Sequence, residues 1–518
     1  MCFSTKLFQH TMTFLQKISC FVCTFATTIS VFATSVESRP GELASLLSDH
    51  SITSLKVTGE MDARDFKFIA DNLSLLSELD LSEVSICAYT NVETPVFGTD
   101  VYYSEATIPG TAFFGMPLTK VTLPNHLQTV GYAAFAGCTA LSEITFPAAL
   151  DSIGAFAFNG TALTSVTIPA SITVVEEGAF AHCGKLTSAG ISSATIGKEA
   201  FLADTALTTL SLGAEVKTIG DGAFNSCTAL TSINFTGHSI TSVGEAAFAN
   251  TALAVLDLSA QSSLTTISDW VCANAPLSEA KLPESVTTIG NGAFFYATEL
   301  QSAELPRHIT SIPAYTFTGA EALLTDTIIP AEVKEVGEYA FYNAASLSRF
   351  VIPQNVQHIA TKAMAGTIGL QMIEVNTPIV PTLGDSVWAG VNQPEVKVDV
   401  THTALVPNFI QAEQWNKFHI LQNYLLGDVN SDGVLDITDV SMLVSYVLGE
   451  NPSNFNDLVA DINRDNLYDV SDVSLLNEML LNGNSIIIQL TPAGVSVIGS
   501  ISSPTEQTDL RQSQQILK

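Results

Sequence analysis

Residues 163–186, LTSVTIPASITVVEEGAFAHCGKL, contain the pattern that decides the fold. One apolar run ends at Pro169, a second ends at Val175, and Gly178-Ala179-Phe180 and a closing Leu186 follow. Nearly the same segment recurs on both sides, and its phenylalanine returns every 21–24 residues. This period predicts a solenoid, in which each repeat packs on its neighbours. The phenylalanine position is filled by Phe113, Phe135, Phe158, Phe180, Phe201, Phe224, Phe248, Phe294, Phe317 and Phe341, and we assign Val271 and Met364 to it in two further repeats.

Each repeat is predicted to build two walls of the solenoid. In the first apolar run the alternate residues Leu163, Val166 and Ile168 face inward, and the following proline ends the strand because it has no N–H to donate. In the second run Ile172, Val174 and Val175 face inward together with the phenylalanine. Glycines such as Gly220 and Gly244 are predicted to permit a tight bend. The phenylalanines are therefore interpreted as a stacked core and not as a binding site.

The charge balance excludes one large class of partner. The 518 residues include 20 basic and 51 acidic side chains, a formal net charge of −31, so that little would neutralise the phosphates of a nucleic acid. Residues 1–33 are predicted to be an export signal, because Lys6 and Lys17 precede the apolar run 18–33. The alternative, a membrane anchor, is disfavoured because a span needs about 20 apolar residues.

Three cysteines, Cys138, Cys183 and Cys227, occupy the same position in different repeats. If successive strands stack about 4.8 Å apart, cysteines two repeats apart are about 10 Å apart, too far for a disulfide. They are predicted to be small buried apolar side chains.

The segments that flank the array differ from it. Residues 34–110 are predicted to form an N-terminal cap and the first repeats, with strands at 55–57 and 79–81 on either side of a helix around 65–75. Residues 111–375 form the regular array, and 376–426 form a degenerate last repeat and a C-terminal cap that contains Trp415 and Phe418. Residues 484–518 are a tail to which we assign no role.

The repeated pattern IPxxVxxIGxxAFxxCxxL resembles the leucine-rich repeats of the BspA-like, Treponema-type family of bacterial surface proteins over residues 41–425. The resemblance implies a leucine-rich-repeat solenoid of short β-strands with an irregular or 3-10 convex side. It also implies display on a bacterial surface, binding of host or microbial proteins or glycans, and no catalytic residue. Residues 406–421 resemble the closing amphipathic helix of that family.

Two acidic loops follow the array, and their spacing is that of calcium-binding loops. The second loop repeats the first 33 residues later, with Asn466 where the first has Gly433; asparagine tolerates the left-handed conformation that such a turn needs. The predicted side-chain ligands are Asp428, Asn430, Asp432, Asp436 and Asp439, then Asp461, Asn463, Asp465, Asp469 and Asp472, with backbone carbonyls from Val434 and Leu467. The sequence therefore predicts two Ca²⁺ sites.

An apolar helical pattern follows each loop, which disfavours the alternative of an acidic, disordered linker. The pattern consists of Val440, Leu443, Val444, Val447 and Leu448, then Val473, Leu476, Leu480 and Leu481. Aspartate at the twelfth loop position and the lack of a helix before either loop make residues 427–483 resemble a type I dockerin. That resemblance implies calcium-dependent docking onto a cohesin-like protein. It also implies that loop positions ten and eleven, Ile437-Thr438 and Val470-Ser471, contribute to the choice of partner.

The middle residue of the first strand forms an exposed polar row along the repeats. Its members include Thr122, Thr145, Thr167, Ser211 and Asn234. Such a row is where a solenoid presents a binding surface, although a face that only keeps the protein soluble has the same composition. Both interpretations stay open.

No nucleophile elbow, zinc-protease helix, phosphate loop or Cys-x-x-Cys pair occurs after residue 33, so we expect no enzyme. Two functional hypotheses follow. In the first, the chain is a secreted or cell-surface, adhesin-like interaction protein that docks through its dockerin-like module. In the second, it is a non-catalytic subunit of a cellulosome-like assembly that degrades polysaccharide.

Overall fold

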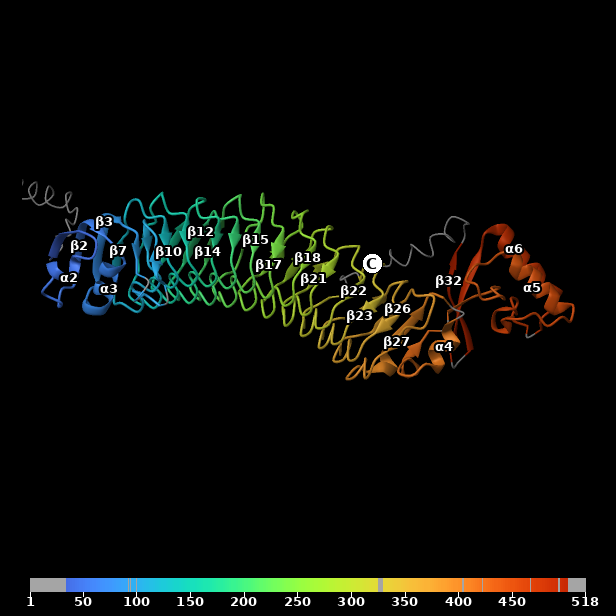
Figure 1. Cartoon of the computed structure of the whole chain (residues 1–518). Helices are drawn as coiled ribbons and strands as arrows, with labels where there is room; N and C mark the ends of the chain where they lie inside the picture. Colours follow the sequence, from blue (N-terminus) through green and yellow to red (C-terminus); the bar gives the residue numbers. More distant parts are fainter. Residues whose placement is uncertain are drawn as a thin grey trace, which may run out of the picture. The chain divides into compact units, whose positions relative to one another are not determined.

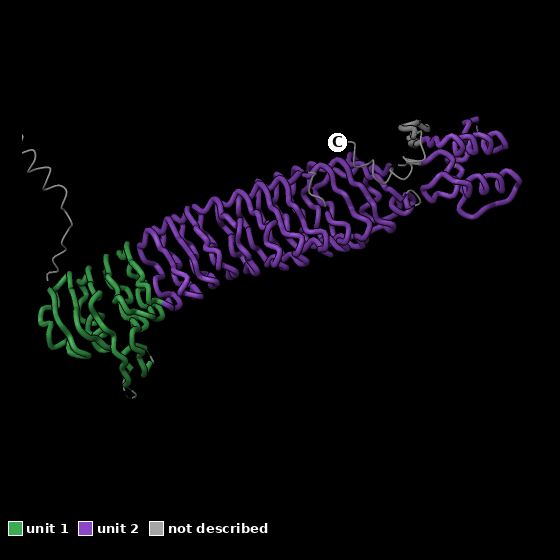
Figure 2. Tube along the Cα trace, turned by 90° about the horizontal axis from the view of Figure 1, so that it is seen from above, with its two compact units in different colours: residues 1–150 green, residues 151–518 purple. Residues whose placement is uncertain are grey.

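The computed structural model describes residues 34–501, apart from residues 92, 94, 99, 325–328, 403–404, 422, 466 and 492–493. Two compact units, residues 1–150 and 151–518, make up the chain (Figure 2). The predicted export signal at residues 1–33, the substitute loop residue Asn466 and the last part of the tail, 502–518, lie outside the described residues.

In the first unit a parallel four-stranded sheet has the order β1-β2-β3-β7. Its strands are β1 (Thr34–Ser38), β2 (Ser54–Met61), β3 (Glu78–Ile86) and β7 (Lys120–Thr122). The shorter strands pair as β4 (Tyr89–Thr90) with β5 (Tyr102–Tyr103), antiparallel, and as β6 (Thr107–Ile108) with β8 (Thr129–Val130), parallel. The helices are α2 (Leu43–Leu46) and α3 (Ala63–Asn72), so that the predicted helix begins and ends slightly earlier than expected.

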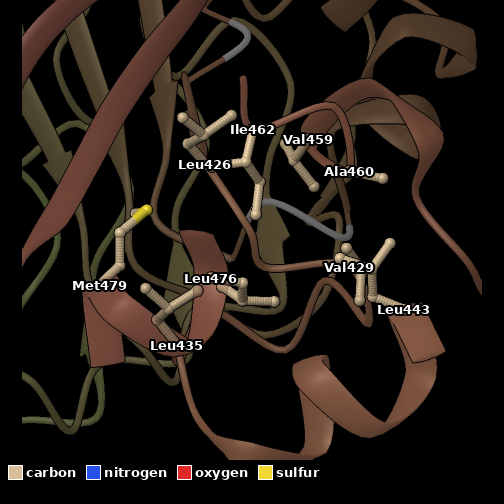
Figure 3. Close-up of a cluster of buried hydrophobic side chains, with 9 residues drawn as sticks. All are labelled: Leu426, Val429, Leu435, Leu443, Val459, Ala460, Ile462, Leu476 and Met479. Atoms are coloured by element: carbon tan, nitrogen blue, oxygen red, sulfur yellow. The ribbon is translucent and has the colours of Figure 1, made fainter. Parts of the chain in front are cut away.

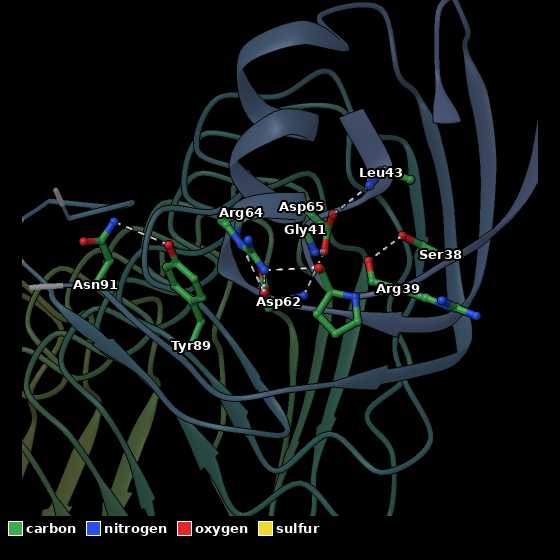
Figure 4. A network of polar contacts seen from close by, with 10 residues as sticks. Ser38, Arg39, Gly41, Leu43, Asp62, Arg64, Asp65, Tyr89 and Asn91 are labelled. Atoms are coloured by element: carbon green, nitrogen blue, oxygen red, sulfur yellow. Dashed lines mark hydrogen bonds and ion pairs between the residues drawn. The ribbon is translucent and has the colours of Figure 1, made fainter. Parts of the chain in front are cut away.

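The carboxylate of Asp65 ties the start of α3 to the chain before it (Figure 4). It accepts hydrogen bonds from the backbone N–H groups of Asp62 (2.9 Å), Gly41 (2.7 Å) and Leu43 (3.0 Å). Asp62 in turn accepts from the Arg64 N–H, which completes a capping box. Burial raises the pKa of Asp65 even though three N–H groups donate to it. These bonds fix where the helix begins.

In the second unit the array consists of two walls of short parallel strands (Figure 1). The first wall comprises β10 (Ser165–Ile168), β12 (Ser188–Ile191), β14 (Thr209–Leu212), β17 (Val255–Asp257), β19 (Glu279–Lys281), β21 (Ser302–Glu304), β24 (Arg349–Ile352), β26 (Met372–Val375), β28 (Lys397–Val400) and β29 (His419–Ile420). The second wall comprises β9 (Ser152–Ile153), β11 (Val174–Val175), β13 (Thr195–Ile196), β15 (Thr218–Ile219), β16 (Ser242–Val243), β18 (Thr266–Ile267), β20 (Thr288–Ile289), β22 (Ser311–Ile312), β23 (Glu335–Val336), β25 (His358–Ile359) and β27 (Thr382–Leu383).

Consecutive turns, which we call the turn side, connect each strand of the second wall to the next strand of the first wall. Between residues 111 and 375 the described part of the chain contains no helix, so this side is irregular as predicted. Here the N–H of each phenylalanine donates to the next turn: Phe158 to the carbonyl of Ala179 (2.8 Å), and Phe180 to that of Ala200 (2.9 Å). The solenoid predicted from the period is thus confirmed, together with the irregular side that the resemblance implies.

The phenylalanine rings form a buried spine. Rings of successive turns from Phe158 to Phe248 stack with centroids 5.4–6.1 Å apart and planes within 11° of parallel, and all are fully buried. The cysteines beside the spine are buried as predicted, and the five cysteines in the described residues are all free. The thiol of Cys183 also donates to the carbonyl of Phe158 (3.2 Å).

One assignment to the spine is wrong. The N–H of Phe248 donates to the carbonyl of Val271, and the N–H of Cys272 donates to that of Ala293. This register puts Cys272, not Val271, at the spine position. Val271 takes the preceding position, where most repeats have alanine, because the small cysteine leaves room for a larger neighbour.

Two details of the repeat also differ from the prediction. Val174 points outward with 36% of its surface exposed, and only Ile172 and Val175 of the second run are buried. Gly220 and Gly244 do not adopt the left-handed conformation. They are required by a close approach, because a Cβ on Gly244 would lie 2.4 Å from the backbone nitrogen of Asp221 in the preceding turn.

The end of the array departs from the single closing helix that we expected over 406–421. The chain there forms α4 (Val406–Gln411), the 3-10 turn η3 (Trp415–Lys417) and β29; another 3-10 turn, η1 (Gln393–Glu395), precedes β28. The helix ends because Ala412 is extended (ψ 134°), and Gln414, with φ +66°, precedes the 3-10 turn. Trp415 is 1% exposed and packs against Trp388, Phe409 and Phe418, so the predicted role of Trp415 and Phe418 in cap packing is confirmed.

A separate apolar cluster lies in the C-terminal module, between α5 (Ile437–Val447) and α6 (Val470–Asn482) (Figure 3). The described cluster contains Leu426, Val429, Leu435, Leu443, Val459, Ala460, Ile462, Leu476 and Met479. The module also contains the 3-10 turn η4 (Asp457–Val459). Strand β30 (Asn423–Leu425) before the module pairs antiparallel with β31 (Ser485–Thr491) after it, and β31 pairs with β32 (Gly494–Ile501).

Adjacent phenylalanines provide a matched test of the spine. Phe113 is fully buried and stacks on Phe135 at 5.0 Å, whereas Phe114 is 64% exposed. Phe113→Ala should lower the free energy of unfolding by about 3–5 kcal/mol because it opens a cavity in the spine. Phe114→Ala should change it by less than about 0.5 kcal/mol. Chemical denaturation of the full chain measures both, and equal losses would contradict a spine-centred core.

Candidate calcium and docking site

Each acidic loop is built into the start of a helix. The Asp436 carboxylate caps α5 by accepting the Thr438 N–H (2.7 Å), and the Asp439 carboxylate reaches back to the Asp436 N–H (2.9 Å). Asp439 is fully buried, and Val429 and Leu435 anchor the loop in the apolar cluster. The predicted ligands at positions nine and twelve are therefore held by the capping box of the helix.

Backbone N–H groups orient the remaining carboxylates of the first loop. Asp428 accepts from the N–H groups of Asp432 (3.1 Å) and Gly433 (3.0 Å), and Asp432 accepts from that of Val434 (2.9 Å). Gly433 has φ +82°, as a sharp turn at this position requires. The side-chain oxygen of Asn430 accepts from the Asp432 N–H (2.9 Å).

The second loop repeats most of these bonds. Asp465 N–H donates to Asp461 (3.1 Å) and to Asn463 (3.0 Å), as Asp432 does in the first loop. Asp465 accepts from the Leu467 N–H (2.9 Å), and the Asp472 carboxylate accepts from the Asp469 N–H (3.0 Å). The same scaffold is thus formed twice from residues 33 positions apart.

The first loop holds negative charge that no basic side chain balances. Burial, with the neighbouring carboxylate Asp439 as a second cause, raises the pKa of Asp428 to about 6. Burial also raises the pKa of Asp439 to about 6. Neither forms an ion pair with Lys, Arg or His among the described residues. A bound cation would supply the missing charge.

The donors suit calcium better than a transition metal. They are oxygens of Asp and Asn with a backbone carbonyl at position seven, and calcium takes six to eight oxygens. The described residues contain no ready cluster of three or more His, Cys, Asp or Glu side chains. The carboxylates instead accept the loop N–H groups given above, and an asparagine supplies one of the expected ligands in each loop.

The residues at loop positions ten and eleven differ in whether their side chains are hydrogen-bonded within the loop. Ile437 and Val470 are 65% and 68% exposed. The hydroxyl of Thr438 bonds to Asp436 (2.6 Å) and accepts from Asn430 (2.9 Å), and Ser471 makes the equivalent bonds in the second loop. The hydroxyls of Thr438 and Ser471 are thus engaged within the loops, although both residues are exposed like Ile437 and Val470.

The helical pattern overestimated the buried face of the module. Leu448 and Leu481, which we included in that face, are 76% and 79% exposed because each lies at the end of its helix. Together with Ile437 and Val470 they give each half of the module an exposed apolar pair at equivalent positions. Leu448 and Leu481 are therefore surface residues that the sequence analysis misassigned.

The predicted polar row on the repeats is exposed. Thr167 on β10 and Ser211 on β14 are held in line by strand pairing, with Gly190 of β12 between them. Thr145 and Asn234 lie outside the strands, so the row is interrupted there. Thr122 and Thr145 line a shallow depression of about 170 Å³ in the first unit. Each of these residues is exposed, and their arrangement within each unit indicates no particular ligand.

The sequence analysis missed a group of aromatic side chains on the turn side, among them Trp270, Tyr315 and Tyr339. Each occupies the position two residues before the spine. Aligning the repeats at that position, instead of only at the spine, would have revealed them.

Comparison with known families agrees with both parts of this architecture. A model of the BspA type leucine rich repeat region matches six times, over residues 106–202, 194–324 and 265–395. The chain belongs to the BspA-type leucine-rich-repeat family. A dockerin type I domain matches residues 426–481. Both are non-catalytic interaction modules, dockerin type I domains bind calcium, and a surface or secreted location is typical of proteins that carry them.

Solved structures show the same repeat fold. A leucine-rich repeat protein from Bacteroides ovatus ATCC 8483 is 23% identical, with 71% of this BspA-type chain and 86% of that chain covered and a TM-score of 0.55. A leucine rich cell surface protein from Faecalibacterium prausnitzii A2-165 is 26% identical over 53% of this chain and 84% of that one, with a TM-score of 0.33. No curated protein matches the chain. Within the described residues, no helix is both long and apolar enough to cross a membrane.

Removal of calcium should unfold the dockerin module and leave the repeats folded. Carboxylates about 5 Å apart repel by roughly 3 kcal/mol per pair at an effective dielectric constant near 20, and folding of such loops is coupled to metal binding. Hydrogen–deuterium exchange of the full chain in calcium and in chelator measures this. We expect peptides from α5 and α6 to lose protection in chelator and peptides from β10–β14 to keep it. Equal protection of α5 and α6 in both solutions would contradict the prediction.

Proposed function

We propose that this chain is a secreted or cell-surface, adhesin-like interaction protein with no catalytic role. Its repeats bind a protein or glycan, and its dockerin module docks onto a cohesin-like protein when calcium is bound. The observation that carries the proposal is the duplicated loop, in which the same hydrogen bonds orient the same donors twice. The outside of the cell, where calcium is abundant, is the location that fits this module.

Each loop is proposed to hold one calcium ion. In the first loop the side chains of Asp428, Asn430, Asp432, Asp436 and Asp439 and the carbonyl of Val434 would supply the oxygens. In the second the donors would be Asp461, Asn463, Asp465, Asp469 and Asp472 and the carbonyl of Leu467. The ion balances the buried charge of the loop and thereby fixes the start of α5 or α6.

The exposed apolar residues of the module are the proposed contact with the partner. Ile437 and Val470 lie beside the loops at equivalent positions, and Leu448 and Leu481 lie at the far ends of the same helices. Because the loops set the direction of both helices, calcium controls whether these side chains share a surface. Thr438 and Ser471 contribute through the loops, to which their hydroxyls are bonded.

Single-loop variants test the number of ions. Asp432 and Asp465 occupy position five of each loop and do not cap a helix, so that their loss removes a calcium ligand without removing a helix cap. Asp432→Ala or Asp465→Ala should lower the bound calcium from two ions to one, measured by equilibrium dialysis of the full chain, and the double variant should bind none. Glu478→Ala, on the exposed side of α6, is the control and should keep both. Two ions bound to either single variant would refute the assignment.

A capture experiment tests docking. The full chain is used as bait for extracellular proteins of the source organism, in calcium and in chelator. We expect a protein with a cohesin-like module to be captured only in calcium, and the double variant Ile437→Asp, Val470→Asp to lose it while still binding calcium. Thr167→Asp, on the exposed row of the repeats, is the control. A captured scaffold with many such modules would favour the polysaccharide-degrading assembly; capture that is indifferent to calcium would refute the proposal.

A further inference from the structure

The turn side of the repeats carries a group of partly exposed aromatic side chains that no part of the proposed function uses. We call it the aromatic patch: Trp270, Phe295, Tyr296, Tyr315, Tyr339 and Tyr342. All six lie within two residues of a spine position, in the turns between residues 270 and 342. We propose that this patch binds a neutral polysaccharide by stacking sugar rings on its aromatic faces.

The rings of the patch touch one another across successive turns. Trp270 lies 5.2 Å from Phe295 and 6.1 Å from Tyr315, and Tyr315 stacks on Tyr339 at 5.3 Å with planes 8° apart. Tyr296 contacts Phe295 at 4.6 Å, and Tyr342 contacts Tyr339 at 5.5 Å. The rings therefore form one continuous surface along the array, as a polymer would require.

Glycines of the next turns make room for two of the rings. A Cβ on Gly292 would lie 2.2 Å from two ring carbons of Trp270, and one on Gly319 would lie 3.0 Å from the ring of Tyr296. The two rings thus lie against the following turn on one side, while Tyr296 keeps 44% of its surface exposed. Their positions are set before any ligand arrives, which lowers the entropy cost of binding.

The fold does not require aromatic residues at these positions. Trp270, Tyr315 and Tyr339 have φ of 56°, 62° and 55°, the left-handed region in which a bulky side chain is unusual. The equivalent residue of the other turns is Thr111, Ala133, Phe156, Gly178, Glu199, Gly222, Ala246, Gly292, Lys362 or Ser386, and all of them share the positive φ. Most turns therefore do without an aromatic residue at this position. The gathering of three aromatic residues there between residues 270 and 339, outside the core, indicates a binding surface.

The polar groups around the patch favour a neutral, hydroxyl-rich ligand. Asn274 and Asn343 each lie two residues after the spine position of their turn, as Tyr296 does in its turn. Asn274 donates to Asn250 (3.0 Å), and Asn250 donates to Asn225 (3.0 Å), so that a row of uncharged amides leads up to the rings. With a net charge of −31 the chain repels polyanions. Aromatic faces beside amides match the apolar C–H faces and the hydroxyls of neutral sugars.

This inference deepens the proposed function, on which it rests for the role of the repeats as the ligand-binding part. Trp270 can report on binding. The chain has three tryptophans; Trp388 and Trp415 are 2% and 1% exposed, and only Trp270 is partly exposed. Stacking of a sugar ring on Trp270 should change its fluorescence, while the other two stay shielded.

The test is affinity electrophoresis of the full chain through gels that contain xylan, β-glucan, galactomannan, amylopectin or, as an anionic comparison, polygalacturonate. We expect at least one neutral polysaccharide, and not polygalacturonate, to retard the protein. The double variant Trp270→Ala, Tyr315→Ala should weaken retardation at least tenfold. The single variant Trp270→Phe, which keeps an aromatic ring, should show most of the wild-type retardation. Phe114→Ala removes an exposed ring outside the patch and should leave retardation unchanged.

The same polysaccharide should shift the tryptophan emission of the wild type and not that of Trp270→Phe. No retardation by any of the neutral polymers, or equal retardation of the wild type and the Trp270→Ala, Tyr315→Ala variant, would overturn the proposal. Hydrogen–deuterium exchange of strands β17–β24 shows whether the repeats of each variant are folded. Calcium-dependent docking of each variant, measured in parallel, separates failure of the patch from failure of the proposed function.

Discussion

The array depends on one repeated interaction, the contact of each turn with the next through the phenylalanine position. There the backbone N–H donates to the neighbouring turn, and the ring stacks on the ring of that turn. The hydrogen bond and the stacking contact both run along the axis of the array. One residue per repeat therefore fixes both the spacing of the turns and their register. The two strand walls follow from this register, because residues at equal distances from the phenylalanine come to lie side by side.

The sequence was sufficient to predict the fold, because in a solenoid the residues that recur with the repeat period are also the residues that become buried. A phenylalanine every 21–24 residues predicts stacked turns, and the structure has them. Where the prediction failed, the cause was local. Val271 matched the spacing but not the hydrogen-bond register, which only the neighbouring turns define. The prediction of one closing helix failed because the backbone becomes extended at Ala412, which no periodicity reveals.

The dockerin module illustrates a different kind of information. The loop spacing identified every candidate ligand, because side-chain donors must recur at fixed positions around an ion. It did not show which neighbours face a partner. Thr438 and Ser471 are polar and lie at the right place, yet their hydroxyls are bonded within the loops. Leu448 and Leu481 belong to the helical pattern, yet they lie beyond the last turn that packs. Exposure at the ends of short helices depends on tertiary contacts, which periodicity does not contain.

Cys272 interrupts the stacked rings of the array, and we call the turn that contains it the joint. A cysteine in place of phenylalanine takes a stacking ring out of the spine between Phe248 and Phe294, and the rings on either side form two separate piles. In a chain of nearest-neighbour contacts, a weaker link limits how far order on one side supports order on the other. Under mechanical load the repeats before residue 272 and those after it would yield as two segments. The aromatic patch begins at this joint, with Trp270.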